Sequence, residues 1–155
     1  MSAITLRGGS EADRAFVLDL GSRTSVDSVS SLREAPEAFV VESYRNLLAY
    51  AFARKYVLEI AESALEGPLG FVLMLEDLPD EVTGMPQAFI AYMAVEPDAR
   101  RRGVGATLLA AAEERARARG LGIVSLMVTE ENAAARELYA QAGYRTERRL
   151  LCKTL

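Results

Sequence analysis

In the first third of the chain, the pattern of apolar and polar residues is first that of a strand and then that of two helices. The strand-like run covers residues 4–7. Ser10, which stands before two acidic residues, marks the start of the first helix. Pro36 opens the second helix, in which apolar residues recur at helical spacing up to about Arg54. The polar stretch 21–35 between them is expected to be a loop or a broken helix.

The middle of the chain is rich in β-branched and aromatic residues and predicts three strands. Residues 56–61 and 69–76 are separated by the turn cluster 66–68, which contains glycine and proline and is typical of a hairpin. The segment 77–86 holds two further prolines and is expected to be a loop. A third strand is predicted over residues 87–95.

The last third alternates helices with apolar runs. A helix follows Gly103, a buried strand covers 121–128, and a second helix begins near Asn132. The segment 144–155 can hold one long strand or a pair of strands. The complete order is strand, two helices, three strands, helix, strand, helix, strand, which predicts an α/β domain with a mixed sheet.

Length and composition are those of one globular domain over residues 1–155. No run approaches the roughly 20 apolar residues of a membrane span, and residues 1–10 lack the basic and apolar blocks of a signal peptide, so a cytoplasmic protein with no membrane partner is expected.

The chain contains no histidine, which excludes His-based triads and His-based metal sites, and we expect no metal. The single Cys152 has no partner for an internal disulfide and is given no role.

The net charge of −4 conceals two halves of opposite sign. Residues 1–99 carry 7 basic and 16 acidic groups, a net −9, whereas residues 100–155 carry 11 and 6, a net +5. The two halves are therefore expected to face different partners.

A turn with little side-chain bulk joins the strand that ends near Val95 to the next helix. Small residues at Gly103, Gly105 and Ala106 let an anion approach the amides at the helix start, where the helix dipole favours negative charge. The same residues would also be expected in a simple turn, with no ligand, before a helix that ends in basic residues. A dinucleotide-binding fold is disfavoured, because its motif needs a third small residue where this chain has Leu108. A Walker-type nucleotide-binding loop is excluded, because no Gly-Lys-Ser/Thr follows the turn. The chain is acidic overall, so we do not expect it to bind nucleic acid.

The run Val95-x-Pro97 followed by Arg100-x-x-Gly103-x-Gly105-Ala106 resembles the central motif of Gcn5-related N-acetyltransferases, the GNAT family. The resemblance implies a mixed, mostly antiparallel sheet of six to seven strands flanked by about four helices. It implies an acetyl-CoA-dependent N-acetyltransferase in which strand backbone pairs with the pantetheine arm and helix-start amides hold the diphosphate. The cofactor-binding residues implied are Met93, Ala94, Val95, Arg100, Arg101, Arg102, Gly103, Val104, Gly105, Ala106, Thr107 and Asn132.

Residues 132–144 are similar to the second motif of the same family, Asn-x-x-Ala-x-x-x-Tyr-x-x-x-Gly-Phe/Tyr. Asn132 and Tyr139 are seven residues apart and so lie on one helix face. They could also be only a helix cap and a packed aromatic. The resemblance implies that Tyr139 is the catalytic proton donor to the departing thiol. The unperturbed pKa of a tyrosine, about 10 against about 8.5 for a thiol, is consistent with that role.

The general base is left open among Glu76, Asp77, Tyr92 and Glu130. The branch of the family that acetylates ribosomal proteins typically has a glutamate five residues before the motif asparagine, where this chain has Met127, which argues against that subclass.

The acidic half favours a cationic primary amine as acceptor, on a small molecule or a protein, with specificity residues in 21–44 and 77–87. A homodimer is possible through residues 150–155, although a terminal core strand would have the same sequence. Two other functions remain open: a CoA-binding sensor or partner-binding module without turnover, and a nucleotide-binding module.

Overall fold

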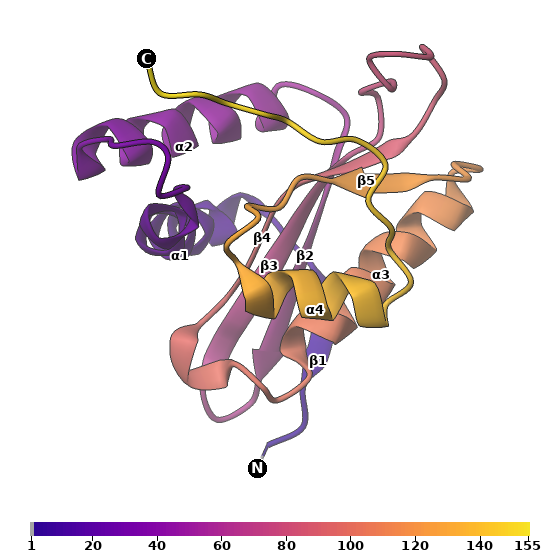
Figure 1. Cartoon of the computed structure of the whole chain (residues 1–155). Coiled ribbons are helices and arrows are strands. Elements are labelled where there is room, and N and C mark those ends of the chain that lie inside the picture. Colours follow the sequence, from indigo (N-terminus) through magenta and orange to yellow (C-terminus); the bar gives the residue numbers. More distant parts are fainter. Residues whose placement is uncertain (1) are drawn as a thin grey trace.

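A computed structural model describes residues 2–155 as one sheet covered by helices on both faces (Figure 1). The strands are β1 (Thr5–Gly8), β2 (Tyr56–Ser63), β3 (Gly67–Leu75), β4 (Ala88–Val95) and β5 (Val124–Leu126). The helices are α1 (Arg14–Ser25), α2 (Glu37–Phe52), α3 (Val104–Ala118) and α4 (Ala133–Gln141), with short 3-10 turns at Glu11–Asp13, Val26–Ser28 and Pro97–Ala99.

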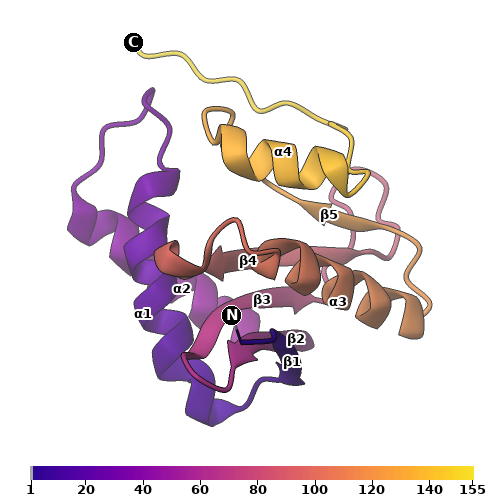
Figure 2. The same ribbon diagram turned by 90° about the horizontal axis from the view of Figure 1, so that it is seen from below.

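The sheet follows the order of the chain, β1-β2-β3-β4-β5. The first four strands pair antiparallel, whereas β5 runs parallel to β4. A parallel neighbour needs a crossover connection, and α3 provides it. Helices α1 and α2 lie on one side of the sheet, and α3 and α4 lie on the other (Figure 2).

Two apolar clusters, one on each side of the sheet, form the core. The first joins α3 to the sheet and includes Val72, Met74, Val104, Leu108 and Ala112. The second joins α1 and α2 to the opposite side and includes Val17, Leu20, Leu48, Ile60 and Phe71. Because alternate residues of β3 point to opposite sides, Phe71 and Val72 enter different clusters.

Local signals in the sequence placed most of the elements correctly. Ser10 and Asp13 form a capping box at the first helix, and the second helix begins directly after Pro36. The hairpin over residues 56–75 is confirmed, with Gly67 at a φ of 75°. Helix α1 extends farther than expected, because it continues through Gly21 to Ser25.

The prediction for the end of the chain is wrong. Residues 144–155 contain no strand, so the described residues form a sheet of five strands and not six or seven. The run 121–128 likewise shortens to three paired residues in β5. Strand propensity alone does not make a strand, because the backbone must also have a neighbour to pair with, and the terminal run has none among the described residues.

No helix within residues 2–155 has both the length and the apolar character needed to span a membrane.

Replacement of Leu108 should show how strongly the α3 side of the core is packed. Leu108 is completely buried, so Leu108→Ala removes apolar contacts and leaves a cavity. We expect the free energy of unfolding to fall by about 2–5 kcal/mol in urea titrations followed by circular dichroism. Leu65, which is 84% exposed in the β2–β3 turn, is the matched control, and Leu65→Ala should change stability by less than about 0.5 kcal/mol. Equal effects of the two substitutions would contradict the described packing.

Candidate functional site

The site begins where β4 separates from β5. The two strands pair only from Ala88 to Ile90 of β4, and beyond this point β5 no longer accompanies β4. A bulge at Ala91 interrupts the β3–β4 register, since Leu73 pairs with Tyr92 and Met74 pairs with Ile90. Bulges bend a strand and often end its pairing. The backbone of residues 91–95 is therefore fixed by β3 on one edge and has no strand on the other.

The chain then makes the turn that the sequence identifies as a phosphate cradle. Arg101 has a φ of 61°, which is unusual for a residue with a side chain, and Gly103 has a φ of 83°. The first helical hydrogen bond of α3 is donated by the amide of Thr107 to the carbonyl of Gly103. Within residues 2–155, the amides of 101–106 have no hydrogen-bond acceptor. They are available, at the positive end of a helix, to an anionic ligand.

The arginine side chains of this turn have different surroundings. Arg102 donates two hydrogen bonds to the carboxylate of Glu66, at 2.9 and 2.7 Å, and this guanidinium lowers the pKa of Glu66 to about 2. Arg100 and Arg101 are exposed. The Arg102 side chain thus connects the turn to the β2–β3 hairpin, while the Arg102 backbone amide has no hydrogen-bond acceptor among the described residues.

Helix α4 lies over the start of α3. The Asn132 side chain accepts a hydrogen bond from the Ala135 amide at 3.2 Å, so the capping role predicted for Asn132 is confirmed. A β-carbon added to Gly105 would stand 3.1 Å from the Leu138 side chain. Glycine therefore allows the two helices to approach closely. A shallow hollow of about 420 Å³ lies between them, lined by Ala106, Leu109, Ala110, Glu113, Leu138, Gln141 and Ala142.

Tyr139 points its aromatic ring into the α3 side of the core and packs against Tyr144, with the ring centroids 5.9 Å apart. Burial raises the pKa of Tyr139 above the usual value of about 10, and the neighbouring Tyr92 raises the pKa further. The hydroxyl makes no hydrogen bond with any residue between 2 and 155. Tyr139 is therefore a protonated phenol at neutral pH with a free donor.

The four residues considered as candidates for the general base lie in different parts of the structure. Glu76 and Asp77 follow β3 at the end of the sheet remote from Val95, where they pair with Arg119 and Arg54. Glu130 is 87% exposed and pairs with Arg136 at 3.6 Å.

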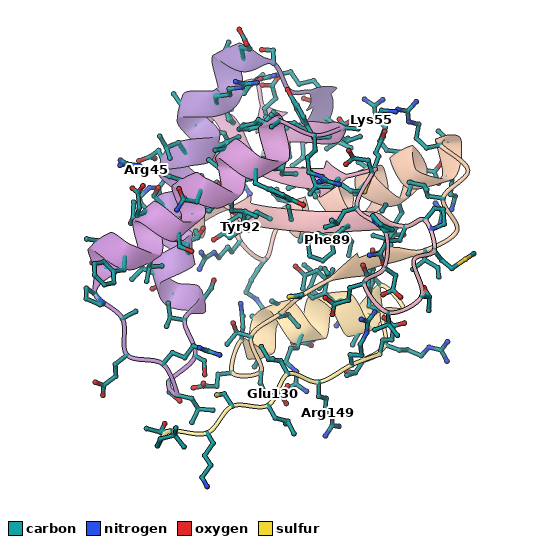
Figure 3. All side chains as sticks on the ribbon, turned by 90° about the horizontal axis from the view of Figure 1, so that it is seen from above. Arg45, Lys55, Phe89, Tyr92, Glu130 and Arg149 are labelled. Carbon is teal, nitrogen blue, oxygen red and sulfur yellow. The ribbon has the colours of Figure 1, made fainter. Side chains whose placement is uncertain are left out.

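Only Tyr92 lies on the open part of β4. Its hydroxyl hydrogen-bonds to the Thr24 hydroxyl at 2.8 Å, and burial raises its pKa. Figure 3 labels Tyr92 on β4 and Glu130 in the β5–α4 loop.

A contact between distant segments closes one side of this region. The Thr129 hydroxyl donates to the Ser28 carbonyl at 2.6 Å, and the Glu131 carboxylate accepts from the Ser31 amide at 2.9 Å. These bonds join the α1–α2 loop, residues 26–36, to the β5–α4 loop. The sequence did not identify Thr129 or Glu131, because their partners lie about one hundred residues away and leave no local pattern.

The two segments expected to carry acceptor specificity are therefore not equivalent. Part of 21–44 reaches both Tyr92 and the start of α4 through Thr24 and the α1–α2 loop. The segment 77–87 leads into the first residue of β4, at the opposite end of that strand from the turn before α3.

The fold thus places an unpaired part of a strand edge next to a helix start whose amides have no acceptor among the described residues. The model of the acetyltransferase (GNAT) family matches residues 27–144, and the chain belongs to this family. No curated protein sequence matches it significantly.

Solved structures of similar fold cover nearly the whole chain. A protein of Pyrococcus furiosus assigned as an acetyl transferase has a TM-score of 0.84 at 24% identity, over 99% of this chain and 100% of the other. A GCN5-related N-acetyltransferase from Ralstonia eutropha has a TM-score of 0.75 at 21% identity, over 98% and 99%. AAC(6')-Iy, in complex with the bisubstrate analogue CoA-S-monomethyl-acetylneamine, has a TM-score of 0.69 at 17% identity, over 99% of each chain.

The connection between the two loops can be tested by hydrogen exchange. In Glu131→Ala the Ser31 amide loses its acceptor, and a hydrogen bond to a charged group contributes about 1.5–3 kcal/mol. We expect amides of residues 28–32 to exchange at least about tenfold faster, measured by mass spectrometry, since 1.4 kcal/mol corresponds to a factor of ten. Glu130→Ala is the control, because Glu130 is the exposed neighbour that pairs with Arg136 and not with this loop. Unchanged exchange in Glu131→Ala would show that the contact does not order the loop.

Proposed function

We propose that the protein transfers the acetyl group of acetyl-CoA directly to a primary amine within a ternary complex. The observation that supports this most strongly is the continuity between the unpaired edge of β4, residues 91–95, and the uncommitted amides 101–106. A free strand edge can accept the amide-bearing pantetheine arm as an added strand. The helix start beside it offers donors for the diphosphate.

The cofactor-binding residues predicted from sequence fit this arrangement by position. Met93 to Val95 would hold the arm and orient the thioester, and the turn from Arg100 to Thr107 would surround the diphosphate. The hollow between α3 and α4 adjoins Ala106 and offers room for a further part of CoA. Asn132 would act mainly through the α4 cap that supports Tyr139.

In the reaction the amine nitrogen attacks the thioester carbonyl carbon, a C–N bond forms and the C–S bond breaks. An acceptor that arrives as a cation first loses one proton to water, which frees the lone pair of the nitrogen. After the attack the nitrogen loses a second proton to water, and the departing sulfur gains one proton from Tyr139. Tyr139 carries its proton at neutral pH, because the ordinary pKa of a tyrosine is about 10 and burial raises the pKa of this one. Water from solvent then restores the phenol.

An amine acceptor is favoured by the charge of the first half of the chain. Residues 1–99 carry a net −9. The end of α1 belongs to this half, and its Thr24 hydroxyl hydrogen-bonds to Tyr92, so a cation would be attracted to that side of the site. The bisubstrate ligand of AAC(6')-Iy, which joins CoA to an acetylated aminoglycoside fragment, is consistent with an amine-bearing small molecule.

A CoA-binding sensor without turnover is the second candidate. It is favoured by the positions of Glu76 and Asp77, which are paired with arginines at the far end of the sheet from Val95. Release of thiol from acetyl-CoA in the presence of an amine library separates the two functions. Binding of acetyl-CoA without thiol release from any amine would favour the sensor.

A negative charge at the start of α3 should affect stability and binding in opposite directions. Ala106 is exposed in the first turn, where Asp stabilises a helix by about 0.3–1 kcal/mol through the dipole. The same carboxylate would repel a bound diphosphate, because like charges 4 Å apart interact by about 1 kcal/mol in water and more near a protein surface. We expect Ala106→Asp to unfold at an equal or higher temperature and to bind acetyl-CoA about tenfold more weakly in calorimetry.

Ala118→Asp is the matched control, because Ala118 is exposed at the other end of the same helix. There the carboxylate opposes the dipole, so this variant should be slightly less stable and should bind acetyl-CoA normally. Unchanged affinity in Ala106→Asp, or no binding of acetyl-CoA by the unmodified protein, would contradict the proposed site.

Tyr139→Phe should remove the proton donor while keeping the ring. We expect kcat to fall by about 10²-fold or more, with the affinity for acetyl-CoA little changed, because general acid catalysis typically contributes that much. Tyr144→Phe is the control: its hydroxyl donates to Glu113 at 3.2 Å, and its loss should leave kcat within about threefold of the unmodified enzyme, a change of under 1 kcal/mol. Undiminished kcat in Tyr139→Phe would remove Tyr139 from the mechanism.

A further inference from the structure

The turn 100–103, which joins β4 to α3, makes few contacts that fix its shape. Ala99 before it and Val104 after it are buried in the α3 side of the core, whereas the residues between them are exposed or half-buried. The amides of 101–103 bond to no backbone carbonyl within residues 2–155. Main-chain hydrogen bonds therefore hold both ends of this segment and not its middle.

The conformation of the turn is one that a chain does not adopt readily by itself. Arg101 has a φ of 61°, and no other described residue apart from glycines has a positive φ. Such a residue costs free energy, because its β-carbon approaches the following carbonyl oxygen. Successive amides in a turn of this kind can form a concavity that suits an anion, but their dipoles are unopposed when no anion is bound. The empty turn is therefore expected to relax unless another part of the molecule holds it.

One side chain of the turn is held by another element. Arg102 donates a hydrogen bond to each oxygen of the Glu66 carboxylate, at 2.9 and 2.7 Å, and the Arg102 side chain is only 18% exposed. Among the described residues, no other side chain of 101–103 makes a hydrogen bond or an ion pair. A bidentate pair fixes the direction of the guanidinium as well as its distance. Arg102 therefore joins the turn to one defined point of the β2–β3 hairpin.

Glu66 is itself held in place. The buried Ser63 hydroxyl donates to the Glu66 carboxylate and accepts from the Glu66 amide, both at 3.1 Å. Ser63 is the last residue of β2 and pairs with Gly67, the first residue of β3. The carboxylate is therefore fixed by the end of a paired hairpin and not by a free loop.

The hairpin end lies beside the end of β4. The Glu96 amide donates to the Leu69 carbonyl at 2.8 Å, which continues the pairing of β3 and β4 past Val95. Figure 1 shows the β2–β3 turn and the connection from β4 to α3 at the same end of the sheet. The ion pair between Arg102 and Glu66 thus joins two segments whose bases are already fixed relative to each other.

We propose that Glu66 is a positioning residue for acetyl-CoA, because it acts through Arg102 to hold the turn 100–103 in the shape that presents its amides to the diphosphate. This role rests on the proposed function, which places the diphosphate at this turn. The Arg102 side chain then braces the turn, and the positive charge offered to the ligand comes from Arg100, Arg101 and the helix start. Glu66 lies outside both sequence motifs, so neither motif indicates this role.

Removal of the ion pair should weaken binding without affecting turnover. Glu66→Gln keeps the size of the side chain and removes its charge. If the released turn adopts the binding shape about one tenth of the time, the affinity for acetyl-CoA falls about tenfold, measured by calorimetry. KM for acetyl-CoA should rise by a similar factor, and kcat at saturation should stay within about twofold, because the contacts to the reacting atoms are kept.

Glu62→Gln is the matched control. Glu62 lies on the same hairpin and pairs with Arg7 at 2.9 Å, but this ion pair joins β2 to β1, so the variant should bind acetyl-CoA normally. Arg102→Ala should weaken binding as much as Glu66→Gln, and the double variant should bind no more weakly than either. Tighter binding by Glu66→Gln, a further loss in the double variant or an equal loss in Glu62→Gln overturns the proposal.

Trypsin reports on the turn in the absence of any ligand, because it cleaves after arginine and residues 100–102 are three arginines. The rate of cleavage follows the population of locally open states. We expect Glu66→Gln to be cleaved within 100–103 about tenfold faster than the unmodified protein. Cleavage after Arg33, in the α1–α2 loop, is followed by mass spectrometry in the same digest and should not change.

The digest also separates the role of Glu66 from the proposed function. No binding of acetyl-CoA by the unmodified protein contradicts the proposed function, and the digest still decides whether Glu66 holds the turn. Unchanged cleavage at the turn in Glu66→Gln overturns the role of Glu66, whatever the protein binds.

Discussion

The separation of β4 from β5 is the constraint on which the rest of the site depends. β4 is paired with β3 from Phe89 to Val95 apart from the bulge at Ala91, so its position is fixed whether or not β5 accompanies it. β5 is held to β4 for only three residue pairs. The contact between Gly105 and Leu138 then sets α4 against α3. An open strand edge, which is normally a liability in a sheet, is thereby kept inside the fold.

Local chemistry made the central part of the site predictable from sequence. A strand that ends near Val95, a turn without bulky residues and a helix start are all features of neighbouring residues, and the structure has each of them in place. Asn132 was recognised as a cap for the same reason. By contrast, the hydrogen bonds between the α1–α2 loop and residues Thr129 and Glu131 join positions about one hundred residues apart. No periodicity or motif in the sequence predicts them.

The end of the chain shows a different limit of sequence reasoning. Leu150 and its neighbours have the composition of a strand, but composition describes a residue's preference and not the presence of a partner. The arginine triplet at 100–102 shows the same limit for function. The residue type does not reveal that the Arg102 side chain is bound by Glu66, whereas the backbone amides expected to hold the diphosphate have no other acceptor among the described residues.

Helix α4 combines an important position with a weak attachment. It has no fully buried residue, in contrast to the sheet, where Phe71, Leu73 and Met74 are completely enclosed. Elements with little buried apolar surface open at lower free energy than the global fold. The phenol of Tyr139 is therefore carried by one of the first parts of the molecule to loosen on warming, so heat inactivation would precede the cooperative melting of the sheet.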